Sequence, residues 1–203
     1  MKALTLTQPW ATLVAIGAKR IETRSWPTKY RGPLAIHAAK GFPKWAKANV
    51  LYDWDFFGAL RPELSEHYQR NNVSIVPCAA GYEALRSLPL GSVIATCRLA
   101  NCLPTEVIDN AANVFSVSLD PLSECERAFG DYSQGRYAWI LEDIKPFPEP
   151  IPAKGALGLW EWTEYPGECA SDLGIPGVPC ICALESSSIC PKHGPVGARD
   201  SCI

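Results

Sequence analysis

The sequence lacks any apolar run long enough to span a membrane, and its beginning does not resemble a secretion signal. Residues 1–10 carry one basic residue, Lys2, without the apolar stretch that a signal peptide needs. We therefore expect a cytoplasmic protein that has no membrane segment. Cysteine occurs nine times, an odd number, so the cysteines cannot all pair within the chain. In the cytoplasm, reduced thiols are the expected state.

Acidic residues are nearly absent from the first fifty positions. This segment holds nine lysines and arginines against the single acid Glu22, although the whole chain has a net charge of −2. A protein that coats long duplexes is usually basic throughout. The asymmetry therefore predicts a localised site for an anion.

The composition indicates one globular domain followed by a tail. The 203 residues are 47% hydrophobic and 20% charged, which is enough apolar material for a core. Beyond residue 163, glycine, proline, serine and cysteine replace the aliphatic periodicity. We expect a domain at residues 1–163 and a disordered tail at residues 164–203.

Short alternating segments between turn signals predict a fold that mixes strands and helices. A helix is expected at residues 9–17, a mainly helical insertion with an aromatic cluster (residues 52–57) at residues 43–86, and a short helix at residues 122–129. The pattern predicts an α+β fold, a small mixed barrel with helices at its rim. Strands are expected at residues 4–7, 21–24, 34–38, 92–102, 137–144 and 157–163.

A lysine, a carboxylate and an arginine lie within a few residues of one another at the second expected strand. They are Lys19, Glu22 and Arg24, and the period of two of a strand places the last two on one face. Arginine can hold a phosphate through two hydrogen bonds, lysine supplies a mobile charge, and a carboxylate accepts hydrogen bonds from a base amino group. Aromatic side chains beside cations are typical of sites for unpaired bases, and here they are Trp10, Trp26, Tyr30 and Trp45.

The same residues allow a simpler interpretation, in which Glu22 forms a surface ion pair and the tryptophans belong to the core. Two further candidates have alternatives of the same kind. His37 serves as acid, base or ligand contact, or else as a hydrogen-bonded structural histidine. Lys40 extends the anion surface together with Lys44, Lys47 and Trp45, or these residues form a solvated helix face.

Separate groups of residues along the chain carry a resemblance to a known family. Near the start they are Gln8-Pro9-Trp10, Gly17-x-Lys19-x-x-Glu22-x-Arg24, Trp26-Pro27 and Tyr30-Arg31-Gly32 before Ile36-His37-Ala38. Further on they are Gly91-Ser92-Val93-Ile94, Tyr137-Ala138-Trp139-Ile140-Leu141-Glu142 and Gly155-Ala156-Leu157-Gly158-Leu159-Trp160. Together these groups resemble the ASCH domain, the activating-signal-cointegrator homology family, over residues 2–163.

The resemblance implies a PUA-like β-barrel with a cleft for RNA or another nucleic acid. It also implies that Lys19, Glu22 and Arg24 face the ligand, with Trp26 and Arg31 beside them. The leading prediction is a module that binds single-stranded RNA or a nucleotide in a basic, aromatic-lined cleft. Its predicted ligand-binding residues are Lys19, Glu22, Arg24, Trp26, Arg31, Trp10, His37 and Lys40.

A hydrolase is the first alternative, because some relatives look catalytic. In a bacterial amidohydrolase that acts on N4-acetylcytidine, a lysine activates a threonine three positions later, whereas this chain has Glu22 there. A hydrolase of a modified nucleoside or of RNA would use Lys19 and Glu22, with water as nucleophile and Glu22 as general base. Lys19 or Arg24 would stabilise the oxyanion. A metal-assisted nuclease would need a further acid, such as Glu142, in the cleft.

The second alternative is a protein-interaction domain that uses the aromatic cluster at residues 52–57 or the cysteine-rich tail. The tail also holds four potential zinc ligands, although their spacing fits no standard zinc finger. We therefore expect no cofactor. The four candidate ligands are Cys180, Cys182, Cys190 and His193.

Overall fold

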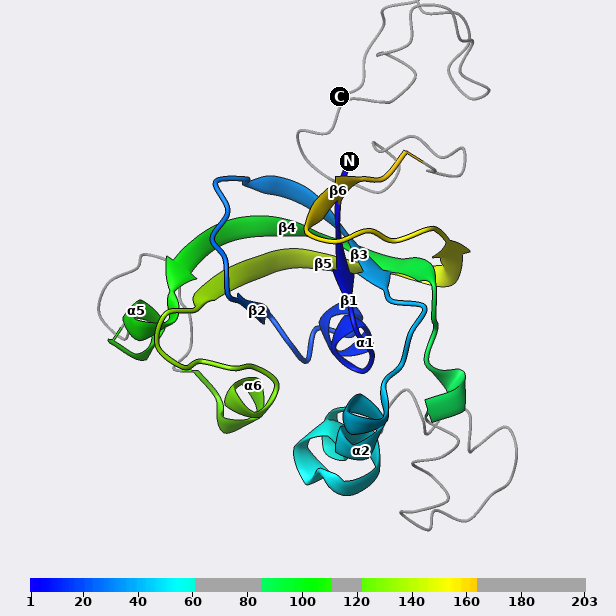
Figure 1. The fold of residues 1–203 in the computed structure, drawn as a ribbon, viewed down its shortest axis with the longest axis horizontal. Coiled ribbons are helices and arrows are strands. Elements are labelled where there is room, and N and C mark those ends of the chain that lie inside the picture. The colour runs from blue at the N-terminus through cyan, green and yellow to red at the C-terminus, as the bar shows by residue number, and fades with distance from the viewer. Residues whose placement is uncertain (61–84, 111–121, 164–203) are drawn as a thin grey trace, which may run out of the picture. The chain divides into compact units, whose positions relative to one another are not determined.

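The computed structural model describes residues 1–60, 85–110 and 122–163 of the chain. In this part, six strands form one mixed sheet that curls into a half-barrel, with helices beside it (Figure 1). This confirms the predicted α+β, PUA-like fold. The strands are β1 (Lys2–Leu6), β2 (Ile21–Arg24), β3 (Gly32–Ala38), β4 (Ser92–Pro104), β5 (Tyr137–Pro152) and β6 (Leu159–Glu161). The helices are α1 (Trp10–Ala15), α2 (Lys44–Tyr52), α5 (Thr105–Asn110) and α6 (Glu124–Ala128).

The strand order across the sheet is β2-β5-β4-β3-β1-β6. Strand β1 pairs with β3 in parallel, so the chain must cross over between them, and it does so through α1 and β2. The pairs β1 with β6, β2 with β5, β3 with β4 and β4 with β5 are antiparallel. In this order β2 lies at one edge of the sheet and β6 at the other.

Alternating apolar residues of the central strands form the core beneath the curl. Leu4 of β1 pairs with Ile36 of β3, and both are buried together with Leu34 and Trp139. Burying side chains of this size stabilises a fold by roughly 1.5–3 kcal/mol each. Helix α1 packs against β3 and β4 through its buried face, which includes Val14.

Gln8 fixes the start of α1. Its buried side-chain oxygen accepts a hydrogen bond from the backbone N–H of Thr12 at 3.1 Å, and its amide nitrogen donates to the Pro89 carbonyl at 2.8 Å. One of the N–H groups that a helix start leaves without a partner is thereby satisfied. Gln8 therefore ties the first helix to the segment that leads into β4.

Strand β5 is longer than the sequence pattern predicts, because prolines hide its second half. Beyond Ile140 it has no β2 partner, so among the described strands only β4 pairs with it. Next to the end of β5, the N–H of Ala153 donates to the Gly91 carbonyl. Proline is tolerated in a strand that has a neighbour on one side only, because a missing N–H on the open side costs no ladder bond. The four prolines of this stretch are Pro146, Pro148, Pro150 and Pro152.

The other predicted elements are present with small shifts, with one addition. Helix α2 and a second helical stretch at residues 54–60 fall within the expected insertion, whose residues 61–84 lie outside the described part. Helix α6 confirms the short helix expected at residues 122–129. Helix α5 was not predicted from the sequence. The tail at residues 164–203 lies outside the described residues, so its predicted disorder stays a prediction.

Candidate functional site

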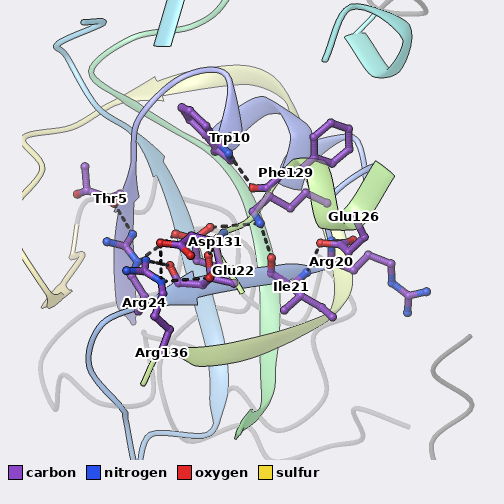
Figure 2. A network of polar contacts seen from close by, with 12 residues as sticks. Thr5, Trp10, Arg20, Ile21, Glu22, Arg24, Glu126, Phe129, Asp131 and Arg136 are labelled. Carbon is purple, nitrogen blue, oxygen red and sulfur yellow. Dashed lines mark hydrogen bonds and ion pairs between the residues drawn. The ribbon is translucent and has the colours of Figure 1, made fainter. Parts of the chain in front are cut away.

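A pocket of about 540 Å³ opens between β1, β2, the two helices α1 and α2, and the segment at residues 128–136. Its volume lies within the usual range for small-molecule sites. Polar contacts connect its walls, as Figure 2 shows. The lining residues are Thr5, Leu6, Thr7, Trp10, Glu22, Thr23, Arg24, Trp45, Ala128, Phe129, Gly130, Asp131 and Arg136.

Strand β2 presents a carboxylate and a guanidinium side by side. Glu22 and Arg24 lie two residues apart on a strand and both line the pocket, with 3.0 Å between Glu22 Oε1 and Arg24 Nε. The contact is ionic, since that Nε makes no aligned hydrogen bond. The Nη2 atom of Arg24 also donates to the Thr5 carbonyl at 3.0 Å. The pair is therefore held in place from two strands, which leaves one acceptor and one donor group fixed toward the pocket.

Lys19 lies behind this pair and does not line the pocket. Its side chain has 0% exposure, and its ammonium lies 3.7 Å from Glu22 Oε2 and donates to the Ile21 carbonyl. Burial lowers the pKa of Lys19 because it disfavours the charged form, while Glu22 and Glu126 act in the opposite direction. Lys19 thus supports Glu22 from behind, and its contact with a ligand stays a prediction.

Glu126 of α6 holds the start of β2. Its two carboxylate oxygens accept hydrogen bonds from the backbone N–H groups of Arg20 at 2.9 Å and Ile21 at 3.0 Å (Figure 2). Burial raises the pKa of Glu126, and these N–H groups and the Lys19 charge oppose that shift. Ser123 caps α6 by accepting a hydrogen bond from the N–H of Glu126, so the residue that holds β2 is itself held in place.

The segment after α6 forms the second wall of the pocket. The Asp131 N–H donates to Thr23 Oγ1 at 3.0 Å, and the Asp131 carboxylate lies 3.3 Å from Arg136 Nε. Gly130 allows this close approach, because a Cβ there would lie 2.7 Å from the ring of Tyr132 and 3.2 Å from the methyl group of Thr23. Any larger residue at this position would push the wall away from β2.

Two tryptophans form the aromatic side of the pocket. Trp10 is the first residue of α1 and Trp45 the second residue of α2, and their ring centroids lie 5.5 Å apart at an angle of 44°. The indole N–H of Trp10 donates to the Phe129 carbonyl at 2.8 Å, which fixes that ring. Trp45 is 62% exposed and free to meet a ligand on its outer side.

The charged side chains in the lining balance each other. Glu22 and Asp131 are opposed by Arg24 and Arg136, so the pocket itself is not basic. This differs from the expected basic cleft, because most of the cations in the first fifty residues point elsewhere. The pocket is suited to paired donor and acceptor groups more than to bulk negative charge.

Trp26 and Arg31 lie away from the pocket lining. Trp26 packs edge-on against the buried Trp139, with 4.7 Å between ring centroids, because the strand ends before it and the chain turns inward. Arg31 donates to the carbonyl of Thr28 at 2.8 Å and to Asn101 Oδ1 of β4 at 3.0 Å. Both side chains have partners that explain their positions within the fold.

His37 and Lys40 also lie outside the lining. The Nε2 atom of His37 lies 3.1 Å from the Ala153 carbonyl, and its ring packs edge-on against Trp160. Burial lowers the pKa of His37, as expected for a histidine that is held in neutral form. Lys40 is exposed and lies beside Gly91, at the end of β3. These contacts are the ones that a hydrogen-bonded structural histidine would make, which is one of the two roles considered for His37.

The described residues provide no metal site. No group of three or more His, Cys, Asp or Glu side chains there is arranged to hold a metal ion. Glu142, the acid that a metal-assisted nuclease would require, pairs instead with Arg98. The zinc candidates Cys180, Cys182, Cys190 and His193 lie outside the described part. Within the same limits, no helix is long and apolar enough to cross a membrane.

Several lining residues were not identified from the sequence. Thr5, Thr7, Phe129, Asp131 and Arg136 belong to segments without a recognisable motif, and the contact between Asp131 and Thr23 spans 108 positions. The one local signal is the glycine between Phe129 and Asp131, which marks a close approach of the backbone. It does not indicate which segment is approached.

Comparison with known proteins agrees with the architecture. The family model described as the ASCH domain matches residues 4–150, which include most of β1, the whole of β2 to β4 and most of β5. No curated protein sequence matches the chain.

Proposed function

The chain belongs to the ASCH domain family, and on that premise we propose that its pocket holds one unpaired nucleotide of a single-stranded RNA. ASCH domains are generally considered RNA-binding domains of the PUA-like type. The observation that carries the proposal is the fixed pair of Glu22 and Arg24 opposite the tryptophans of α1 and α2.

The chemistry of the pair favours particular bases. The Glu22 carboxylate accepts hydrogen bonds only, and the Arg24 guanidinium donates only. Side by side, they complement a base edge on which an amino group lies next to an acceptor, as in cytosine or adenine. Uracil has a carbonyl where the amino group would be, so its O4 would face the Glu22 oxygens. We expect cytosine-containing RNA to bind more tightly than uracil-containing RNA.

The tryptophan wall provides the test. Replacing Trp45 with Ala removes a ring that is 62% exposed, so the fold should persist. Stacking of a base on an aromatic ring contributes about 1–3 kcal/mol, so the affinity for oligocytidylate should fall by roughly 5- to 150-fold. The measurement is fluorescence anisotropy with labelled oligocytidylate and oligouridylate at low and moderate salt.

A matched control is Trp54→Ala. Trp54 is 76% exposed, lies in the neighbouring helical stretch and is not part of the pocket lining. Its loss should leave the affinity unchanged. Equal effects of the two substitutions, or the absence of any RNA binding at low salt, would contradict the proposal.

A hydrolase acting on a modified nucleoside is the second candidate, and the lowered pKa of Lys19 beside Glu22 is the observation that favours it. In that mechanism Glu22 would take a proton from water and Arg24 would stabilise the oxyanion, while Lys19 would hold Glu22 from behind. Incubation with N4-acetylcytidine tests it. Product that disappears in Glu22→Gln, with binding retained, would establish an enzyme.

A further inference from the structure

One face of α2 is exposed and carries two aromatic rings. Trp45 is 62% exposed and Tyr52 is 76% exposed, whereas Ala46 and Val50 are buried against the domain. Each residue of an α-helix advances by about 100°, so residues seven apart lie within roughly 20° of the same direction. Trp45 and Tyr52 therefore share one face, and Ala48 and Asn49 lie between them, about 60° and 40° from Trp45 around the helix axis.

This face continues from the pocket. Trp45 lines the pocket and contacts Trp10, while Tyr52 lies about 10.5 Å further along the helix axis at the rise of about 1.5 Å per residue. Stacked bases repeat at about 3.4 Å, so the two rings are about three base steps apart. A strand that leaves the pocket over Trp45 can reach Tyr52 within a few nucleotides.

The charge of α2 suits a nucleic acid. The helix contains Lys44 and Lys47 and no acid, and the Lys47 ammonium lies 5.5 Å from the centre of the Phe42 ring. Asp53 follows directly after Tyr52, and its carboxylate accepts the N–H of Asp55 at 3.0 Å while it keeps its charge. Lys44 lies about 100° and Lys47 about 160° from Trp45 around the helix axis, so the two lysines add positive charge near the aromatic face without lying on it.

The remaining exposed ring of the aromatic cluster differs in its surroundings. Trp54 follows α2 between Asp53 and Asp55, and its ring packs edge-on against Phe57. Phe56 of the same cluster is buried against Phe129. Asp53 is next to both Tyr52 and Trp54, whereas Asp55 is next to Trp54 alone, so a phosphate is disfavoured more strongly near Trp54. The cluster at residues 52–57 is thus divided into a buried part, an acidic part and one ring on the α2 face.

We propose that the α2 face (Trp45, Ala48, Asn49 and Tyr52) is a stacking platform for the nucleotides next to the one held in the pocket. The proposal rests on the proposed function, and it specifies the ligand further, as a short single strand of about four nucleotides. Stacking needs only the flat face of a base, so the platform adds affinity without strong sequence preference.

The length of the ligand is the variable that tests the platform. We would measure the affinities of cytidine monophosphate and of oligocytidylates of two to six nucleotides for the full chain and for three variants. For the unaltered chain, affinity should rise with length and level off near about four nucleotides. Tyr52→Ala should remove most of that rise, at least about 5-fold for the longer strands, and leave the monophosphate unaffected.

Two further variants complete the comparison. Tyr52→Phe retains the ring and should behave as the unaltered chain does. Trp54→Ala, equally exposed but flanked by acids, should also have no effect. Circular dichroism confirms that each variant is folded.

The outcomes separate the platform from the pocket. If monophosphate and long strands bind equally well and Tyr52→Ala changes neither, the pocket remains and the platform is wrong. If Tyr52→Ala weakens the monophosphate as much as the long strands, or if Trp54→Ala matches it, the α2 face is not a separate platform. If Tyr52→Ala changes only the mass of the protein in solution, the face is a contact between copies. If no ligand binds at any length, the proposed function itself fails.

Discussion

Lys19 places an ammonium group inside the domain, directly behind the carboxylate that faces the pocket. Such a buried charge is costly unless opposite charges and hydrogen bonds compensate it. Here Glu22, Glu126 and the Ile21 carbonyl provide the compensation. The lysine that a sequence motif suggests as a ligand contact acts in the structure as a support.

Replacing Lys19 with Met should therefore destabilise the domain. The variant leaves the carboxylates of Glu22 and Glu126 without their buried cation, and breaking such a pair costs about 3–5 kcal/mol. Urea unfolding gives the change in the free energy of unfolding. The matched control is Lys2→Met, which breaks a surface pair of 2.6 Å with Glu161 and should cost less than about 1 kcal/mol. Equal losses in the two variants would show that Lys19 is not an essential counterion.

Among the elements, α6 and the segment after it do the most to shape the pocket. Glu126 anchors this segment to β2, and Phe129 and Asp131 then contact Trp10 and Thr23. One wall of the pocket is therefore attached to the other at several points. A change in the anchor should move groups that it does not itself contact.

Glu126→Gln tests the anchor. A glutamine can accept only one of the two backbone hydrogen bonds, so one N–H of β2 loses its partner at a cost of roughly 1–3 kcal/mol. We expect a lower free energy of unfolding and also weaker binding of oligocytidylate, although Glu126 does not line the pocket. Glu124→Gln, an exposed position on the same helix, should change neither quantity. Unchanged binding in a destabilised Glu126→Gln would limit the role of this residue to folding.

Strands and helices with a clear hydrophobic period could be predicted from the sequence, whereas a strand segment rich in prolines could not. The residue patterns of β1 to β4 and the turn signals beside them were sufficient, although β2, β3 and β4 bury consecutive residues and not one face alone. The second half of β5 was missed because a proline at every second position normally argues against a strand. Trp26 was expected beside Arg24. Because β2 ends at Arg24, the period of the strand no longer places the two side chains on one face.

At the scale of the whole molecule, the pocket is assembled from segments that are far apart in the chain. The motif around β2 identified Glu22 and Arg24, because their spacing alone places them together. The opposite wall required knowledge of which strand lies next to which, as the pairing of β2 with β5 brings residues more than a hundred positions apart into contact. No local pattern contains that information.

The distribution of charge could likewise be predicted only in part, because the sequence shows how many charges a segment holds and not where they lie in the fold. The first fifty residues are strongly basic, yet Arg24 is the only one of their cations that lines the pocket. Lys19 is buried, and Arg31 contacts β4. A charge count along the sequence indicated an anion site but could not locate it.

The prolines of β5 have a consequence for the behaviour of the protein in concentrated solution. A free strand edge normally offers a row of N–H donors to which another polypeptide can add as a neighbouring strand, and sheets of this kind grow into aggregates. The second half of β5 contains Pro146, Pro148, Pro150 and Pro152, and none of these residues has an N–H to offer. This edge can pair with β4 on its inner side while it resists recruitment into intermolecular sheets.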